Sequence, residues 1–234
     1  KDFHWGDLQT SLLDGIQLIA MSPGLSPLHE PMAEFLKAAK AQGIPVWSEI
    51  EFFAQALAAL EREQSYQPKV IAITGTNGKT TTTALTGLLC ERAGKTVAVA
   101  GNISPAALDK LSTIDELPEV WGLELSSFQL EHTYSLKATA ATVLNITQDH
   151  LDWHGDMNHY IQAKFKIFGP DTVAVINAED VHITNYQQQL SDQRIVTFSL
   201  QTPTQEDAFG LMHDVAAGGI DWLVWAEPDW EGLE

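Results

Sequence analysis

The chain has 234 residues, with 13 Lys and Arg against 31 Asp and Glu, so its formal net charge is −18. This length predicts one or two domains, and a hydrophobic content of 44% is enough to bury a core. The excess of acidic residues argues against binding to nucleic acid or to an anionic membrane surface, because both bind positively charged protein surfaces. A protein with this charge that handles phosphates therefore needs local cationic groups.

The cysteine content and the hydropathy of the chain limit the kinds of site that it can form and the cellular compartments in which it can reside. Cys90 is the single cysteine, which excludes an intramolecular disulfide and a cysteine-rich zinc site. No apolar run approaches the roughly 18–20 residues of a membrane span. The N-terminal residues do not resemble a signal peptide either. We therefore expect a cytoplasmic protein.

The first part of the chain alternates strand and helix patterns. Short apolar runs predict strands at 16–21 and 44–47, and apolar residues at helical spacing predict helices at 31–41 and 49–63. Gly and Pro residues separate several of these elements. The polar residues 61–68 predict a linker.

After the linker the pattern is that of βαβ units. Val70-Ile71-Ala72-Ile73 is apolar at consecutive positions, as in a parallel strand that is covered on both faces. Strands alternate with helices of 10–15 residues, which predicts an α/β fold with a mainly parallel sheet. The further strands are expected at 96–100, 121–125, 138–144 and 172–176, and the helices at 79–93 and 158–168.

The end of the chain differs in composition. After Arg194 there is no Lys or Arg, while eight acidic residues and the three tryptophans Trp222, Trp225 and Trp230 follow. Two interpretations stay open: an acidic, aromatic interaction segment, or strands at the edge of a larger domain.

The chemistry is concentrated in Gly75-Thr76-Asn77-Gly78-Lys79-Thr80, which follows an apolar strand and begins a helix. Its glycines let backbone N–H groups point at a phosphate, and the helix adds the positive end of its dipole. Lys79 can reach the outer phosphates, and the Thr80 hydroxyl can bind Mg²⁺. The alternative is an ordinary turn with a solvated lysine. The four threonines 80–83 are poor helix formers, so hydroxyls beside a phosphate explain them better.

Two further groups of polar residues follow predicted strands. One begins at Glu124, and the other, Asn145 to Asp152, contains His150. Ligands bind at the carboxyl ends of strands in open α/β sheets, where a carboxylate and an imidazole could together hold a metal ion. Each alone is more often a surface or capping group. By itself, Lys164 has the pattern of an exposed helical lysine.

These motifs resemble the Mur ligases and the related folylpolyglutamate synthetases. The run 73–81 is similar to the ATP loop of both groups, and 145–155 is similar to the central-domain signature of the Mur ligases. Residues 101–103 and 123–131 resemble the branch of the family that adds D-glutamate. Ser22-Pro23-Gly24 also fits that branch.

The resemblance implies a three-domain parent protein. Residues 1–66 would be the C-terminal part of a Rossmann-like UDP-binding domain, and 67–234 a P-loop-type central ATP-binding domain that is itself incomplete. The C-terminal domain would be absent, so we expect the chain alone to be inactive as a ligase. We also expect a monomer.

The activity that the resemblance implies is ATP-dependent addition of D-glutamate to UDP-N-acetylmuramoyl-L-alanine through an acyl phosphate, in peptidoglycan precursor synthesis. The implied roles are phosphate binding by Gly75, Thr76, Asn77, Gly78, Lys79, Thr80 and Thr81, and catalysis by Lys79, His150 and Lys164. Mg²⁺ would be held by Thr80, Glu124, His150 and Lys164, the last as N6-carboxylysine. The muramoyl substrate would contact Gly24, Asn102, Ser126 and Gln129.

Two alternatives remain at this point. The first is another enzyme of the same superfamily, such as a different Mur ligase or a folylpolyglutamate synthetase. The second is a nucleotide-binding module without ligase activity.

Overall fold

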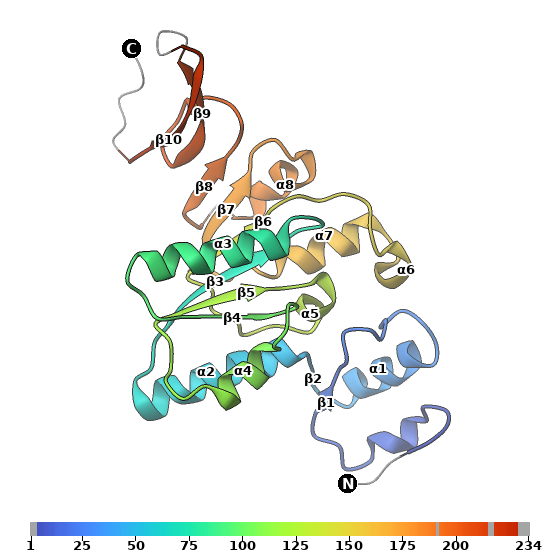
Figure 1. Cartoon of the computed structure of the whole chain (residues 1–234). Helices are drawn as coiled ribbons and strands as arrows, with labels where there is room; N and C mark the ends of the chain where they lie inside the picture. Colours follow the sequence, from blue (N-terminus) through green and yellow to red (C-terminus); the bar gives the residue numbers. More distant parts are fainter. Residues whose placement is uncertain (1–3, 191, 215–217, 229–234) are drawn as a thin grey trace.

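A mainly parallel sheet of eight strands forms the centre of the computed structural model, which describes residues 4–190, 192–214 and 218–228 (Figure 1). The strand order is β10-β9-β8-β7-β6-β3-β5-β4, and within the described ranges only the β9–β10 pair is antiparallel. The predicted α/β fold with a mainly parallel sheet is confirmed. The strands are β3 (Lys69–Thr74), β4 (Val97–Gly101), β5 (Val120–Glu124), β6 (Ala140–Val143), β7 (Val173–Asn177), β8 (Ile195–Phe198), β9 (Ala208–Asp214) and β10 (Ile220–Ala226).

Helices lie on both faces of this sheet. In Figure 1, α3 lies on one side of β3, β5 and β4, and α2 and α4 lie on the other. No helix of the described ranges is long and apolar enough to cross a membrane. The helices that accompany the large sheet are α2 (Glu49–Gln64), α3 (Lys79–Arg92), α4 (Ala107–Thr113), α5 (Ser127–Glu131), α6 (Leu151–His154), α7 (Met157–Phe165), α8 (Val181–Tyr186) and the 3₁₀ helix η2 (Gln187–Leu190).

Alternation along β5 explains how the two layers pack. Trp121 is fully buried and meets Phe53 of α2 edge-on, with ring centroids 4.9 Å apart. The next residue, Gly122, leaves room on the opposite face for α3, where Thr83 and Gly87 are buried. One of the four threonines therefore packs against the sheet, and its hydroxyl donates to the Lys79 carbonyl at 2.9 Å.

A smaller unit precedes the large sheet. It contains the 3₁₀ helix η1 (Thr10–Leu13), the helix α1 (Met32–Ala41) and a parallel pair, β1 (Ile19–Ala20) and β2 (Val46–Trp47). Leu13, Ala39 and Ile44 form its small core. The division of the chain into domains at residues 66 and 67 stays a prediction.

Several predicted boundaries were wrong. The strand predicted at 16–21 is only Ile19–Ala20, and the helix predicted to reach residue 168 ends at Phe165. The linker predicted at 61–68 is shorter, because α2 continues to Gln64 through residues that favour helix. Ser65 follows as the C-cap residue in a left-handed conformation, which ends the helix.

The end of the chain agrees with the edge-strand interpretation. β9 and β10 pair as a hairpin at one edge of the large sheet, and Phe209 stacks on Trp225 with ring centroids 5.4 Å apart. Trp230 lies outside the described residues.

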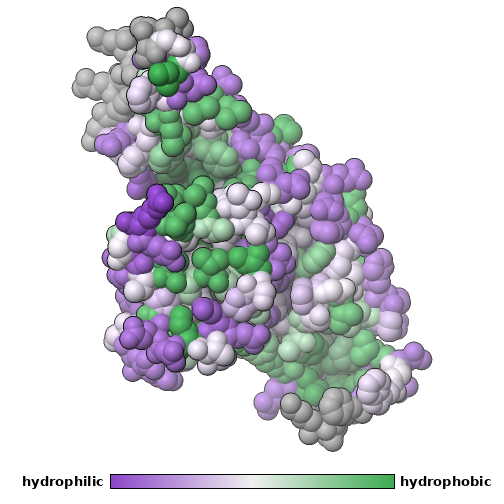
Figure 2. Space-filling model, in the orientation of Figure 1, coloured by the Kyte–Doolittle hydropathy of each residue, from purple (hydrophilic) through white to green (hydrophobic). Residues whose placement is uncertain are grey.

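Part of the surface on the α3 side is apolar. Leu85, Leu88 and Leu89 of α3 are about half exposed, and hydrophobic side chains gather over this helix in Figure 2. Beside α3, a groove of about 460 Å³ runs along the sheet between Ile73 and Phe198. The face that α3 covers is therefore only partly shielded from water.

A buried carboxylate joins the start of α2 to the central sheet. Glu51 is 2% exposed and accepts hydrogen bonds from the backbone N–H groups of Tyr134 and Ser135, from the Ser135 hydroxyl and from Gln55. Burial alone would raise the pKa of Glu51, but these hydrogen bonds outweigh burial and hold it below its usual value. The charged carboxylate is therefore the form that stabilises this junction.

We predict that Glu51→Gln lowers the free energy of unfolding by about 2 kcal/mol at pH 7, because an amide cannot accept all of these hydrogen bonds. A carboxyl group with a lowered folded pKa stabilises above its unfolded pKa, and that stability is lost as the pH falls through the folded pKa. The difference from wild type should therefore shrink in acid. Denaturant titrations at pH 7 and pH 4 measure it, with the exposed Glu63→Gln on the same helix as control. Equal losses in both variants would contradict the prediction.

Candidate active site

The register of the parallel strands brings the predicted site residues to one edge of the sheet. Ile73 of β3 pairs with Glu124 of β5, and Gly101 of β4 also pairs with Glu124. On the other side of β3, Thr74 pairs with Val143 of β6. The segments that follow these strands therefore emerge together at the carboxyl edge, where ligands of open α/β sheets bind.

The loop after β3 has the backbone that its glycines permit. Gly75 has φ of 155° and Gly78 has φ of 82°, both in the region that favours glycine. A side chain at Gly75 would also place its Cβ 3.0 Å from the Leu144 Cβ. The chain can thus turn sharply from β3 into α3 and lie close to the segment after β6.

A second segment holds this loop in place. Asn145 accepts hydrogen bonds from the N–H groups of Thr76 and Asn77, each at 2.9 Å, and its amide donates to the Asn77 carbonyl. The Thr76 hydroxyl lies 3.0 Å from the Tyr160 hydroxyl and accepts from the Thr147 N–H. These bonds use the N–H groups of Thr76 and Asn77 inside the protein, so their role as phosphate ligands stays a prediction.

The first turn of α3 offers the remaining donors. Gly78 is the N-cap residue and has no side chain to cap the helix, and the first N–H groups of a helix have no acceptor within it. Such a terminus favours an anion. The Lys79 ammonium group lies over the loop, where it donates to the carbonyls of Gly75 and Thr76 at 3.0 and 2.9 Å. Thr80 and Thr81 are exposed on the same turn.

Lys164 is not the exposed helical lysine that its pattern alone suggested. It is 2% exposed on α7 and donates to the Gly75 carbonyl at 3.0 Å, with its Nζ 4.6 Å from the centre of the Tyr160 ring. The pKa of Lys164 is lowered to about 7, mainly by burial and also by the neighbouring charge of Lys79, while Asp149 acts in the opposite direction. Two lysine side chains therefore share one carbonyl of the loop.

Glu124 is the carboxylate of this edge, and it is 1% exposed. Its Oε1 accepts from the Asn102 amide at 2.8 Å, but its buried Oε2 has no hydrogen-bond partner among the described residues. Gly101 allows the backbones of β4 and β5 to lie close together at Glu124, because a Cβ at position 101 would lie 2.2 Å from the Glu124 carbonyl oxygen. An unpaired buried carboxylate oxygen is costly unless something else satisfies it, and a hard cation would do so.

The described residues contain no cluster of three or more His, Cys, Asp or Glu side chains that could hold a metal ion unaided. Mg²⁺ commonly takes one or two carboxylates and completes its shell with phosphate oxygens and water. Glu124, together with the Thr80 hydroxyl, fits that donor set. The residues therefore suit a cation that arrives with a phosphate better than a self-contained metal site.

His150 lies at the start of α6 in a left-handed conformation, with φ of 51°. Its Nε2 is 3.3 Å from the Asp149 carboxylate, and both side chains are partly exposed. The structure thus places His150 at the same edge of the sheet, on the segment that follows Asn145 and Thr147.

Two of the predicted substrate residues contact each other. Ser126 and Gln129 form a capping box at the start of α5, in which the Ser126 hydroxyl accepts from the Gln129 N–H and the Gln129 side chain accepts from the Ser126 N–H. Asn102 is occupied by Glu124. All three lie at the carboxyl edge, and their role as substrate contacts stays a prediction.

Gly24 is exposed in the smaller unit, on the loop between β1 and α1. From this loop the Ser26 hydroxyl donates to the Trp153 carbonyl at 2.8 Å, and His29 donates to the Asp152 carbonyl at 2.6 Å. The structure therefore joins the Gly24 loop to α6, the helix whose N-cap residue is His150. A contact of Gly24 with a ligand stays a prediction.

Asn145 and Tyr160 hold the loop after β3 in place, but they were not among the predicted site residues. Asn145 stands directly after a predicted strand, which is a signal for a ligand or loop contact. Tyr160 carries no such signal, because its hydrogen bond to Thr76 spans 84 residues of sequence.

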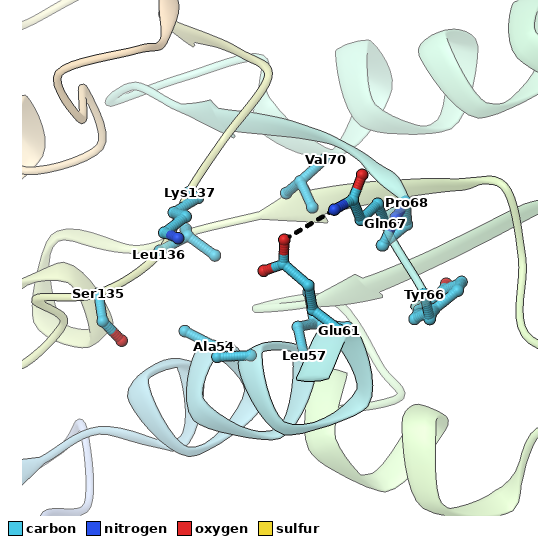
Figure 3. A pocket seen from close by; sticks show the side chains of 11 residues that line it. Ala54, Leu57, Glu61, Tyr66, Gln67, Pro68, Val70, Ser135, Leu136 and Lys137 are labelled. Carbon is cyan, nitrogen blue, oxygen red and sulfur yellow. Dashed lines mark hydrogen bonds between the residues drawn. The ribbon is translucent and has the colours of Figure 1, made fainter. Parts of the chain in front are cut away.

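A separate hollow of about 240 Å³ lies at the opposite edge of the sheet, near the amino ends of β3 and β6. Side chains of α2 line it together with residues 66–68 and 135–137 (Figure 3). Its Glu61 accepts a hydrogen bond from Gln67 at 2.9 Å, so these two polar groups are already paired. The carboxyl edge is thus the better candidate for the active site.

Comparisons with known proteins agree with this geometry. The sequence pattern of the Mur ligase middle domain matches residues 73–217. A protein of Ralstonia nicotianae named UDP-N-acetylmuramoylalanine–D-glutamate ligase is 54% identical over 235 residues, 99% of this chain and 46% of that protein. A protein of the same name from Paraburkholderia phymatum is 56% identical over 230 residues, 97% of this chain and 45% of that protein. The chain thus spans about half the length of these curated relatives.

Solved structures of the same group share the fold. A UDP-N-acetylmuramoyl-L-alanyl-D-glutamate–2,6-diaminopimelate ligase aligns with a TM-score of 0.57 at 25% identity, over 83% of this chain and 47% of that one. MurF ligase from Thermotoga maritima, solved in complex with ADP, aligns with a TM-score of 0.55 at 16% identity, over 83% of this chain and 49% of that one. The resemblance inferred from the motifs is confirmed. Because the middle-domain pattern covers more than half of its residues, including the loop and strand ends described above, this chain belongs to the Mur ligase family.

Proposed function

We propose that this chain is part of an ATP-dependent ligase that joins D-glutamate to UDP-N-acetylmuramoyl-L-alanine in peptidoglycan precursor synthesis. The observation that carries the proposal is the junction at the Gly75 loop, where Lys79, Lys164 and the unpaired oxygen of Glu124 lie at one sheet edge. The high identity to proteins named for this reaction supports the choice of substrates. Such a substrate and ATP belong to the cytoplasm, which we propose as the location.

The reaction begins with two anions that must approach each other. The carboxylate of the muramoyl-alanine attacks the γ-phosphorus of ATP, the bond to the β-phosphate oxygen breaks, and an acyl phosphate and ADP form. The amine of D-glutamate then displaces phosphate from the acyl carbon. Two unit charges 4 Å apart repel by about 4 kcal/mol at an effective dielectric of 20. Cations must therefore be concentrated at this point, above all in a chain with a net charge of −18.

The residues of the loop supply part of that charge. Lys79 would turn from the loop carbonyls toward the β- and γ-phosphates, and the N–H groups of the first turn of α3 would hold the phosphate oxygens. Thr80 and Glu124 would hold Mg²⁺, with His150 beside a second ion. The cation, when bound, neutralises the developing phosphate charge.

We further propose that Lys164 becomes a carbamate. Its neutral amine would attack CO₂, form a C–N bond and release one proton, which leaves an anionic group with two oxygen donors. A hard cation prefers such oxygens, whereas a free ammonium would repel it. The support is the burial of Lys164 and its pKa near 7, which makes the neutral amine abundant at physiological pH.

A pH prediction follows from Lys164. Between pH 7 and 10.5 the unfolded chain holds a proton on this lysine that the folded chain lacks, so stability rises with pH across that window. Lys164→Met should be more stable than wild type at pH 7 and should lose this part of the pH dependence. Melting temperatures at pH 7 and pH 9.5 in CO₂-free buffer measure it, with the exposed Lys137→Met as control.

The same two proteins test the carbamate. With ¹³C-labelled bicarbonate added, wild type should show a carbamate carbon resonance that Lys164→Met lacks. Identical spectra for the two proteins would reject the modification.

The choice of substrate has its own test. A protein of the relatives' full length that contains this chain should release phosphate from ATP only with UDP-N-acetylmuramoyl-L-alanine and D-glutamate together. Diaminopimelate with the glutamylated precursor, and glutamate with a folate, are the competing pairs. Turnover with either pair instead would assign a different ligase, and ATP binding without any turnover would favour a nucleotide-binding module.

Lys79 is the residue whose loss should matter most to this reaction. We predict that Lys79→Ala lowers kcat of the full-length protein by about 10²–10³-fold, because a preorganised charge at the phosphates is removed. Circular dichroism and the melting temperature should stay close to wild type. Lys95→Ala, which removes an exposed lysine paired with Glu119 beyond the far end of α3, is the matched control. Full activity in Lys79→Ala would make the loop a structural turn.

A further inference from the structure

A buried hydrogen bond joins the two segments that carry the candidate cation residues. Glu124 ends β5 and leads into α5, and His150 is the N-cap residue of α6. The Ser127 hydroxyl in the first turn of α5 lies 2.9 Å from the Nε2 of His154, the last residue of α6. Both side chains are 2% exposed, so water does not compete for this bond.

Aromatic rings enclose the same contact. The Phe128 ring of α5 lies 4.8 Å from His150 and 4.7 Å from Trp153, centroid to centroid, and it stacks on His154 with an interplanar angle of 20°. We call Ser127, Phe128, Trp153 and His154 the α5–α6 bridge. Its rings fix the plane of the His154 imidazole, so the position of the His154 Nε2 relative to the Ser127 hydroxyl is also fixed.

The bridge also reaches the phosphate loop. The Tyr160 ring lies 5.2 Å from His154, and the Tyr160 hydroxyl is 3.0 Å from the Thr76 hydroxyl. His154 is thus packed between the segment after β5 and the residue that anchors the loop after β3. None of the roles proposed above uses His154 or Ser127.

We propose that His154 is a positioning residue: through Ser127 and Phe128 it fixes Glu124 and His150 relative to each other for binding of a divalent cation with a nucleotide. The inference rests on the proposed function. Loss of a side chain that holds a metal ligand in position commonly lowers metal affinity by about 10–100-fold. Here the hydrogen bond between Ser127 and His154 joins the two ligand segments directly to each other.

The test removes the bond from either side. His154→Phe keeps an aromatic ring and loses the hydrogen bond, and Ser127→Ala removes its partner with a small change in volume. The full-length protein is titrated with Mn²⁺ in the presence of ATP, and free Mn²⁺ is measured by electron paramagnetic resonance. We expect the Mn²⁺ Kd to rise by about tenfold in each variant. The double variant should bind no more weakly than the weaker single variant, because one interaction has been removed in all three.

A second buried histidine provides the control. His132 is 9% exposed, and within the described part of the chain its buried Nε2 has no hydrogen-bond partner, but it lies outside the bridge. His132→Phe should keep the wild-type Mn²⁺ affinity even if its melting temperature, measured without metal, changes. If His154→Phe does not fold, Ser127→Ala with its melting temperature decides the question alone.

Three results would overturn the inference. The first is that Ser127→Ala and His154→Phe both keep the wild-type Mn²⁺ affinity. The second is that the losses of affinity in the two single variants multiply in the double variant. The third is that His132→Phe loses as much affinity as His154→Phe. A wild-type protein that binds no Mn²⁺ with ATP would instead overturn the proposed function, and this inference with it.

Discussion

Two lysine side chains converge on the carbonyl oxygen of Gly75, each at 3.0 Å, and much of the site depends on this contact. Two full positive charges repel at that separation, and burial adds to the cost of the inner one. Lys164 responds by a pKa near 7, while Lys79 lies closer to the surface. The molecule thus places two lysines, of which Lys164 is readily neutralised, beside the N-terminus of α3. In a chain of net charge −18, such local placement is the means by which phosphate can be attracted.

Parallel register makes this placement possible. Because β4, β5, β3 and β6 run in the same direction, the residues after them meet at one edge although they are far apart in sequence. Close approach at that edge needs small residues, which explains Gly75 against Leu144 and Gly101 against Glu124. Once the backbones are this close, polar side chains such as Asn145 can connect neighbouring loops. The hydrogen bonds that fix the loop after β3 therefore come mostly from a segment 68 or more residues away.

Features set by local sequence could be predicted, whereas features set by contacts between distant segments could not. The strand–loop–helix around Gly75 and Lys79 was predictable, because its signals lie within one local segment and glycine has few other reasons to stand there. The parallel sheet followed from the consecutive apolar residues of its strands. The burial of Lys164 was not visible in its helical pattern, since it results from contacts with Gly75 across 89 residues. The pairing of Ser127 with His154 was hidden for the same reason. Short helices such as α6, of four residues, also give too little periodicity to recognise.

The partly neutral state of Lys164 reconciles two demands that otherwise conflict. A phosphate that enters this edge gains from positive charge, but a divalent cation that enters with it loses from the same charge. A lysine whose pKa lies near 7 can meet both, since it is easily left neutral and a neutral amine can also take up CO₂ and become an oxygen ligand. An arginine could not do so, because its guanidinium stays charged. A methionine would remove the repulsion and offer no hard ligand. Under the proposed function, burial of Lys164 against the Gly75 loop would let this edge take up both a phosphate and a cation.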